Sequence, residues 1–273
     1  MPYITAADGA QIFYKDWGTG QPVIFSHGWP LNSDAWDIEL KLAAENGFRA
    51  IAHDRRGHGR SSQTWAGNDM DTYAADLAAL VDELGLTDII VVGHSTGGGE
   101  VVRFAAQHGA GRVVKVATAG AVPPIMVKSE SNPEGTPLEA FDGIRAGVLA
   151  DRSQFYKDLS EPFFGTNREG STISQGQRDQ FWRLGMQVGL KGAYDCVKAF
   201  SETDFTADLQ ALDMPVFLAH GDDDQIVPIK AAALKSAQLV KNATLKVYPG
   251  APHGIAGEYQ QQLDQDLLEF FKS

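Results

Sequence analysis

The sequence contains a single cysteine, Cys196, among its 273 residues. One cysteine cannot form an intrachain disulfide, so the fold needs no oxidising compartment, and we interpret Cys196 as a small packing residue. No run reaches 18 uncharged apolar residues; residues 113–127 come closest but include Lys115 and two prolines. The first residues show neither a basic region nor an apolar stretch. We therefore expect no signal peptide and a cytoplasmic protein.

Basic residues are scarce relative to acidic ones. The 23 Lys and Arg stand against 35 Asp and Glu, which gives a net charge of −12. Nucleic acids and anionic membranes both attract basic patches, so this balance argues against either as a partner. An apolar content of 43% and a charged content of 21% are typical of a folded globular chain, and this length can bury a large core.

Short apolar runs alternate with helical patterns, which predicts a mainly parallel sheet flanked by helices. Strands are expected at residues 11–17, 23–26, 48–53, 88–92, 113–121, 215–219 and 244–248. Helices are expected at 34–46, 71–84, 97–107, 228–240 and 263–271. Between Pro123 and about Asp213 the strand rhythm stops, and helical segments rich in aromatic residues follow. We expect a helical cap at 123–213, inserted into a core formed by residues 1–122 and 214–273.

An apolar run at 89–92 leads into Gly93-His94-Ser95-Thr96-Gly97, and a helical pattern follows at once. A G-x-S-x-G pattern between strand and helix is typical of a nucleophile elbow, a strained turn that exposes the serine hydroxyl. Only small residues fit two positions before and after the serine. The following helix would direct its positive end at an oxyanion formed there. The alternative is a tight turn with an incidental serine, since the chain has 29 glycines.

A serine nucleophile needs a general base and an orienting carboxylate. After such an elbow the acid and then the histidine are expected, each following a strand. His253 follows the last expected strand and is the candidate base. Asp222, Asp223 and Asp224 follow the strand before it, and spacing alone does not choose among them. A solvated loop histidine and turn-forming carboxylates are the alternatives, but the order of these residues favours catalysis.

The oxyanion of a tetrahedral intermediate needs two N–H donors. The residue after the nucleophile, Thr96, supplies one candidate, and the loop after an early strand supplies the other. That loop reads His27-Gly-Trp-Pro30, in which Pro30 has no N–H, so Trp29 is the second candidate donor. The indole of Trp29 could also pack in the core or form a pocket wall.

Seven segments together resemble the cofactor-free bacterial haloperoxidases, also called perhydrolases, and the related bacterial aryl esterases. They are Asp8-Gly9, Asp16-Trp-Gly18, Ser26-His-Gly-Trp-Pro30, Asp54-Arg-Arg-Gly-His-Gly-Arg-Ser61, Gly93-His-Ser-Thr-Gly-Gly-Gly-Glu-Val101, His220-Gly-Asp-Asp-Asp-Gln-Ile-Val-Pro228 and Ala251-Pro-His-Gly254. The resemblance implies an α/β-hydrolase fold: a mostly parallel eight-stranded sheet flanked by helices, with an inserted helical cap.

The resemblance also implies roles for individual residues. Ser95 matches the nucleophile, His253 the base and Asp224 the acid, which chooses one of the three aspartates. Trp29 and Thr96 match the oxyanion-hole positions. The implied substrate pocket comprises Trp29, Ile144, Leu159, Phe163, Phe200 and Ile226. Two of these, Ile144 and Leu159, stand where aryl esterases often carry phenylalanine, a departure that affects pocket shape and substrate size.

The activity implied by the resemblance is acyl transfer from small carboxylic esters through an acyl-enzyme. Water then releases the acid, or hydrogen peroxide releases a peracid that oxidises halide. The expected partners are a small ester or carboxylic acid and hydrogen peroxide, with no haem, metal, flavin or other cofactor. Relatives of this kind are often homo-oligomers. The alternatives are a lactonase or γ-lactamase of the same fold and, less favoured by the complete triad, a ligand-binding receptor. Loss of ester turnover in Ser95→Ala would separate enzyme from receptor.

Overall fold

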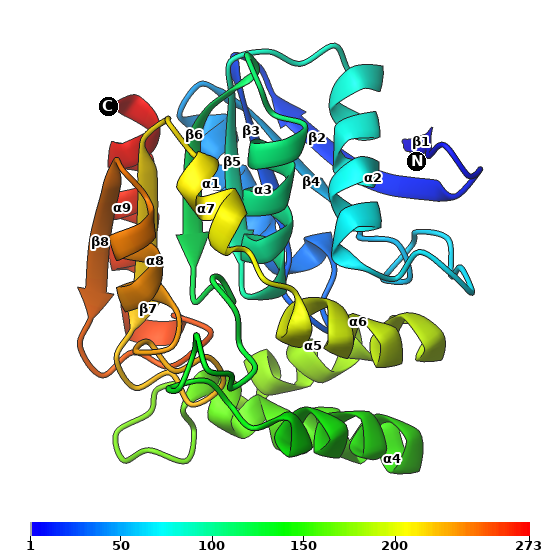
Figure 1. Cartoon of the computed structure of the whole chain (residues 1–273), viewed down its shortest axis with the longest axis vertical. Helices are drawn as coiled ribbons and strands as arrows, with labels where there is room; N and C mark the ends of the chain where they lie inside the picture. Colours follow the sequence, from blue (N-terminus) through cyan, green and yellow to red (C-terminus); the bar gives the residue numbers. More distant parts are fainter. Residues whose placement is uncertain (1) are drawn as a thin grey trace.

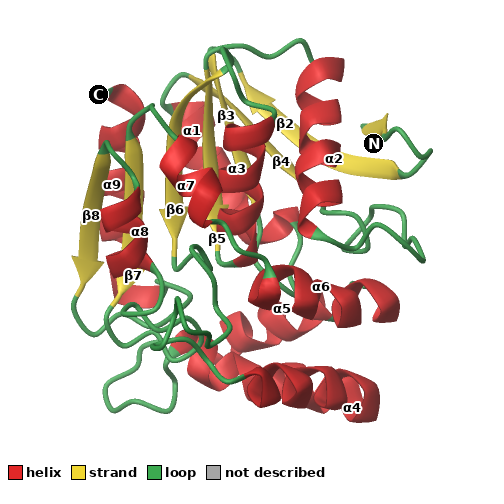
Figure 2. Cartoon of the chain, viewed as in Figure 1, coloured by secondary structure: helices red, strands yellow, loops and turns green. Residues whose placement is uncertain are grey.

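A computed structural model describes residues 2–273, which form one eight-stranded sheet flanked by helices (Figure 1, Figure 2). The strand order is β1-β2-β4-β3-β5-β6-β7-β8. β1 and β4 each pair antiparallel with β2, and all other neighbours are parallel. The strands are β1 (Tyr3–Thr5), β2 (Gln11–Gly18), β3 (Gln21–Ser26), β4 (Phe48–His53), β5 (Ile89–His94), β6 (Val113–Ala119), β7 (Val216–Gly221) and β8 (Ala243–Tyr248). The predicted mostly parallel eight-stranded sheet is confirmed.

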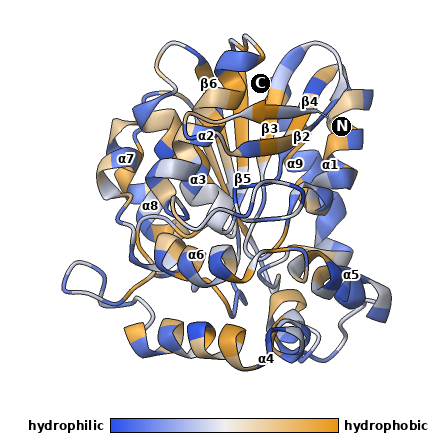
Figure 3. Ribbon diagram, turned by 90° about the vertical axis from the view of Figure 1, so that its right-hand side faces the viewer, coloured by the Kyte–Doolittle hydropathy of each residue, from blue (hydrophilic) through white to orange (hydrophobic). Residues whose placement is uncertain are grey.

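Helices cover both faces of the sheet, as Figure 3 shows in a view along its plane. Helices α1 (Asp37–Glu45) and α9 (Gln260–Lys272) pack on one face, and α2 (Met70–Glu83), α3 (Thr96–Gln107) and α8 (Ala233–Leu239) on the other. Side chains of a strand alternate between faces, and β5 shows the result. Ile89 and Val91 belong to the core under α2 and α3, whereas Ile90 and Val92 belong to the core under α1 and α9.

Three helices inserted between β6 and β7 lie at the carboxyl end of the parallel strands, in the lower part of Figure 1. They are α4 (Leu138–Phe164), α5 (Gln175–Gly185) and α6 (Leu190–Glu202). Helix α4 is kinked at Asp151 (φ −152°, ψ 86°), whose carboxylate accepts from the N–H of Gln154 at 2.9 Å and so caps the second half. The short α7 (Thr206–Ala211) packs on α3 instead.

Most sequence-predicted elements lie within a few residues of their expected places, and the differences have local causes. The sequence pattern locates seven of the eight expected strands and does not locate β1, because three residues are too few to show an alternating pattern. The helix expected at 228–240 begins only at Ala233, since Ala232 is non-helical (φ −118°, ψ −98°). The helix expected at 34–46 starts as a 3-10 turn, η1 (Ser33–Trp36), before α1. No helix of residues 2–273 is both long and apolar enough to cross a membrane.

Candidate active site

Ser95 joins β5 to α3 with φ 54° and ψ −119°. A positive φ is strained for a residue with a side chain and is found where the surroundings enforce it. The neighbouring glycines allow the close approach that this turn requires. A Cβ added to Gly93 would lie 2.3 Å from the carbonyl oxygen of Gly97, and one added to Gly97 would lie 2.1 Å from that of Ser26. Backbone packing therefore demands glycine at both positions.

His253 follows β8, is 1% exposed, and donates from Nδ1 to Oδ2 of Asp224 at 2.7 Å. The other carboxylate oxygen of Asp224 accepts from the backbone N–H groups of Ile226 (2.9 Å) and Val227 (2.7 Å). Burial alone raises the pKa of the Asp224 carboxyl, but the charge and hydrogen bonds of His253 and His220 outweigh it and lower the pKa. Asp224 is thus an ionised, fixed carboxylate bonded to the imidazole of His253.

The two neighbouring aspartates have other partners. Asp222 accepts from the backbone N–H of Gly250 at 2.6 Å. Asp223 forms a two-pronged ion pair with Arg168, at 2.7 and 2.9 Å, on the surface. Of the three adjacent carboxylates, Asp224 is the one that contacts His253.

Two backbone N–H groups beside Ser95 are free to bind an anion. Those of Trp29 and Thr96 donate no hydrogen bond to any group of residues 2–273. Thr96 begins α3, where the first N–H groups have no acceptor inside the helix. The loop that carries Trp29 runs next to the serine, since a Cβ added to Gly28 would lie 3.1 Å from Cβ of Ser95. This arrangement can hold a developing oxyanion.

Comparison with known proteins gives the family. The model of the alpha/beta hydrolase fold family matches residues 21–258. The chain belongs to this family. It is 58% identical to a non-heme haloperoxidase of Rhodococcus erythropolis and 50% identical to the bifunctional esterase/perhydrolase DCH of Acinetobacter calcoaceticus, over 100% of each chain. The crystal structure of a bromoperoxidase from Bacillus anthracis superposes with a TM-score of 0.95 at 36% identity, covering 100% of this chain and 99% of that one. The resemblance inferred from sequence is confirmed.

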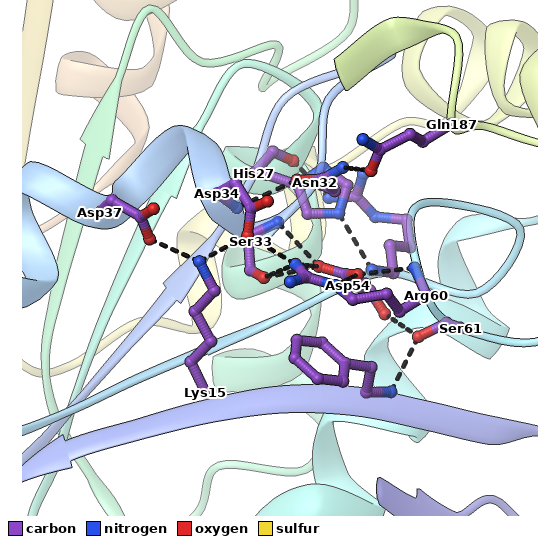
Figure 4. A network of polar contacts seen from close by, with 12 residues as sticks. Lys15, His27, Asn32, Ser33, Asp34, Asp37, Asp54, Arg60, Ser61 and Gln187 are labelled. Carbon is purple, nitrogen blue, oxygen red and sulfur yellow. Dashed lines mark hydrogen bonds and ion pairs between the residues drawn. The ribbon is translucent and has the colours of Figure 1, made fainter. Parts of the chain in front are cut away.

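Asp54, directly after β4, anchors the loop 27–33, which carries Trp29, the candidate oxyanion-hole donor (Figure 4). Its Oδ1 accepts from the backbone N–H (2.9 Å) and the hydroxyl (2.5 Å) of Ser33. Its Oδ2 accepts from the backbone N–H (2.7 Å) and Nε (2.8 Å) of Arg60. Asp54 is fully buried, so these charge-assisted bonds are well shielded from water. They fix the end of the loop 27–33, which carries the N–H of Trp29.

A second buried network lies under the start of the same loop. Glu100 of α3 accepts from Nε of Arg55 (2.5 Å) and the hydroxyl of Ser26 (2.8 Å), and it bonds His53 Nε2 at 2.6 Å. Arg55 also donates to the carbonyl oxygen of His27 at 2.6 Å. Burial opposes the charge of Glu100, but Arg55 and His53 outweigh it and lower its pKa to about 2. The network ties α3 to the strand ends next to the loop 27–33.

The inserted helices contact the loop directly. The indole of Trp29 donates to the carbonyl oxygen of Ala193 in α6 at 3.0 Å, and Asn32 donates to Gln187, between α5 and α6, at 2.8 Å. The ring of Trp29 lies within 6.4 Å, between centroids, of Phe155, Tyr156 and Phe200. Trp29 therefore places its backbone at the candidate oxyanion hole while its side chain joins the inserted helices to the core.

The hydrolase contains a cavity of about 400 Å³ on the α1 and α9 side of the elbow. Of the expected pocket residues, Phe163 lines it. The others belong to the main core cluster, with Trp29 and Phe200 buried and Ile144, Leu159 and Ile226 half-buried. Residues 2–273 hold no cluster of three or more His, Cys, Asp or Glu side chains suited to a metal ion.

Sequence reasoning missed the roles of Asp54 and Glu100. Both stand in segments that carried the family resemblance, and both are charged residues in runs that otherwise read as buried. Two signals could have pointed to these residues: Asp54 is a charge directly after an apolar strand, and Glu100 is a charge in the buried first part of a helix. Most of their partners, Ser33 for Asp54 and Ser26, His53 and Arg55 for Glu100, lie more than 20 residues away in the sequence and are brought together only by the fold.

Proposed function

We propose that this protein is a serine hydrolase that acts on small carboxylic esters and can pass the acyl group to hydrogen peroxide as well as to water. Ser95 is the nucleophile, His253 the general base, Asp224 the orienting acid, and the N–H groups of Trp29 and Thr96 form the oxyanion hole. The observation that carries the proposal is the hydrogen bond from His253 to the buried Asp224. Asp224 follows β7, which lies two strands from β5, the strand that leads into the strained Ser95. The names of the relatives agree with it: haloperoxidase and esterase/perhydrolase.

The reaction begins when Ser95 Oγ attacks the ester carbonyl carbon and its proton passes to Nε2 of His253. His253 is hydrogen-bonded through Nδ1 to Asp224 and makes no bond to Ser95 in this structure, so the transfer requires the substrate-bound arrangement. The negative oxygen of the intermediate accepts from Trp29 and Thr96. The intermediate collapses, the alcohol leaves with the proton from His253, and an acyl-Ser95 ester remains.

The second half of the reaction repeats these steps with a different nucleophile. Water attacks the acyl-enzyme, gives its proton to His253 and releases the carboxylic acid. Hydrogen peroxide attacking in the same way releases a peracid. In solution the peracid transfers its terminal oxygen to a halide ion, which with a proton gives hypohalous acid and regenerates the carboxylic acid. Halide oxidation then needs no redox group in the protein.

Ser95→Ala tests the nucleophile. We expect hydrolysis of a short-chain aryl ester to fall by at least ~10³ in kcat, because the acyl-enzyme cannot form. Ser171→Ala is the matched control, since Ser171 is exposed on a loop and should leave kcat unchanged. Ester turnover by Ser95→Ala at the wild-type rate would show that the assignment is wrong.

A bromination assay tests the peroxide branch. We expect a phenolic dye to be brominated only when acetate, hydrogen peroxide and bromide are all present, and not by Ser95→Ala. Equal bromination without the carboxylic acid would exclude a peracid intermediate.

We also propose that α4, α5 and α6, within the segment 123–213, act as a cap over the reaction site. Their contacts with Trp29 and Asn32 support this, as does their place at the carboxyl ends of the strands (Figure 2). A cytoplasmic location is proposed because the one cysteine, Cys196, is buried and unpaired, and the fold therefore makes no use of an oxidising compartment.

A further inference from the structure

The peptide unit that follows the candidate base is held from two sides. Its carbonyl oxygen, that of His253, accepts from Nε2 of His94 at 3.1 Å. Its N–H, that of Gly254, donates to the carbonyl oxygen of Phe163 at 2.9 Å. His94 is the last residue of β5, directly before Ser95, and Phe163 lies at the end of α4. One peptide unit therefore joins the nucleophile elbow to the inserted helices.

The backbone on either side of this peptide unit packs closely against the end of α4. A Cβ added to Gly254 would lie 2.8 Å from the ring of Phe163. One added to Gly165, the residue that caps α4, would lie 3.1 Å from Cβ of Pro252. Ile255 has φ 42°, which is strained for a β-branched residue and persists only where the surroundings enforce it. The backbone around the candidate base thus has little freedom.

The imidazole of His253 is also packed between two rings. The ring of His94 lies 4.8 Å from it, between centroids, and is tilted by 49°. The ring of Phe163 lies edge-on to it at 5.2 Å and edge-on to His94 at 5.7 Å. These contacts resist rotation of the imidazole away from Asp224, to which its Nδ1 donates.

His94 gives this support without adding a charge. Its Nε2 faces a carbonyl oxygen, which can only accept, so Nε2 carries the hydrogen. Burial, with the charge of His253, lowers the pKa of His94 to about 3, and its ring is neutral at neutral pH. A cation in this place would oppose the positive charge that His253 gains when it takes the proton of Ser95. A neutral donor instead fixes the backbone of the base and leaves its basicity intact.

We propose that His94 is a positioning residue for His253, and that its hydrogen bond to the carbonyl oxygen of residue 253 directs Nε2 of the imidazole toward Ser95. This inference rests on the serine hydrolase function proposed above. A reacting group that is misplaced by about 1 Å can cost on the order of 10² in rate. Because the bond acts on the base and not on the ester, its loss should lower kcat and leave KM almost unchanged.

Two amide variants separate the hydrogen bond of His94 from the polarity of its side chain. In His94→Gln the amide nitrogen reaches the place of Nε2 and can donate to the same carbonyl oxygen, whereas the shorter side chain of His94→Asn cannot. We expect His94→Asn to lower kcat for an aryl ester by about 10–100-fold with KM within about two-fold, and His94→Gln to keep kcat within about three-fold of wild type. His94→Leu, apolar and also without a donor, should lose as much as His94→Asn and replaces it if that variant does not fold. His108→Asn, at the other end of α3, is the control and should leave kcat unchanged.

A second measurement follows the base without turnover. In Ser95→Ala protein, the ¹H NMR signal of the proton between His253 Nδ1 and Asp224 reports how firmly the imidazole is held. We expect this signal to persist when His94→Gln is added and to be lost to exchange with water when His94→Asn or His94→Leu is added. A wild-type enzyme that does not hydrolyse esters would contradict the proposed function alone, and the NMR signal would still decide the role of His94. That role is refuted if the donor-free variants keep the signal and the wild-type kcat, if His94→Gln loses as much as they do, or if KM changes in place of kcat.

Discussion

Replacing Asp224 by Asn should inactivate the enzyme through the protonation of His253 rather than through misfolding. In the structure Oδ1 of Asp224 accepts from the N–H groups of Ile226 and Val227. An asparagine must keep its oxygen toward these two donors, because its amide group could not accept from them. The amide N–H would then face Nδ1 of His253, which must become the acceptor. The imidazole proton is thereby moved to Nε2, the atom that has to accept the proton of Ser95.

The size of the loss follows from this tautomer change. A base that is held in the wrong tautomer, without a carboxylate to stabilise its charged form, costs about 10⁴ in kcat in serine hydrolases. That factor corresponds to about 5.5 kcal/mol of transition-state stabilisation. We expect kcat for an aryl ester to fall by ~10³–10⁴ while KM changes little. Thermal unfolding should show a folded protein, because the backbone contacts of residue 224 are retained.

Asp223→Asn is the matched control. It carries the same chemical change one residue away, where the carboxylate faces Arg168 and the pair is 35% and 50% exposed. Exposed pairs of this kind contribute about 0–1 kcal/mol, so kcat should stay within about two-fold of wild type. An Asp224→Asn enzyme within ten-fold of wild type, or an Asp223→Asn enzyme with the greater loss, would refute the assignment of the acid.

Two further predictions concern stability and loop geometry. Burial raises the pKa of Glu39 to about 8 in the folded protein, from near 4.5 when unfolded, so the folded state binds the extra proton and wild type loses stability as pH rises through this window. Relative to wild type, the free energy of unfolding of Glu39→Gln, measured by chemical denaturation, should rise by on the order of 3 kcal/mol between pH 5 and pH 8. Parallel pH profiles of the two proteins would contradict the buried, protonated carboxyl. Asp54→Asn should lower kcat by about 10–100-fold with little change in KM, because the N–H of Trp29 loses its anchored position, whereas Asp34→Asn at the partly exposed edge of the same network should have a small effect. Equal effects of these two variants on kcat, measured on folded protein, would show that Asp54 does not position the loop.

The parts of the fold that could be predicted are those in which a local pattern has one physical solution. The buried runs ending at Val92 and Ala219 are too short for helices and too apolar for loops, so they indicate parallel strands. Gly93 and Gly97 around Ser95 fit one turn type, and the structure shows that neither has room for a Cβ. Local sequence therefore located the elbow and most of the strands along the chain.

The remaining parts depend on contacts between distant segments. Spacing cannot distinguish Asp222, Asp223 and Asp224, because one residue along a turn changes the direction of the side chain completely. The structure separates them by partners contributed from elsewhere, Gly250, Arg168 and His253. The same holds for the cavity, whose walls come from three parts of the chain and leave no common pattern in the sequence.

The placement of buried charge shows where this fold needs rigidity. Burying the Arg55–Glu100 pair and the carboxylate of Asp54, whose partner Arg60 is 28% exposed, costs several kcal/mol per ion, and apolar residues of similar volume would often be as stable. Both pairs nevertheless lie beneath one loop, residues 27–33. Asp54 accepts from the backbone N–H of Ser33 in this loop. Arg55 donates to the carbonyl oxygen of His27 and to the hydroxyl of Ser26, next to the loop. Directional bonds fix a backbone more tightly than apolar contacts, which tolerate sliding. An oxyanion hole loses most of its effect when a donor moves by about 1 Å. In the mechanism proposed above, the buried charges therefore serve the position of one N–H group, that of Trp29, more than the stability of the fold.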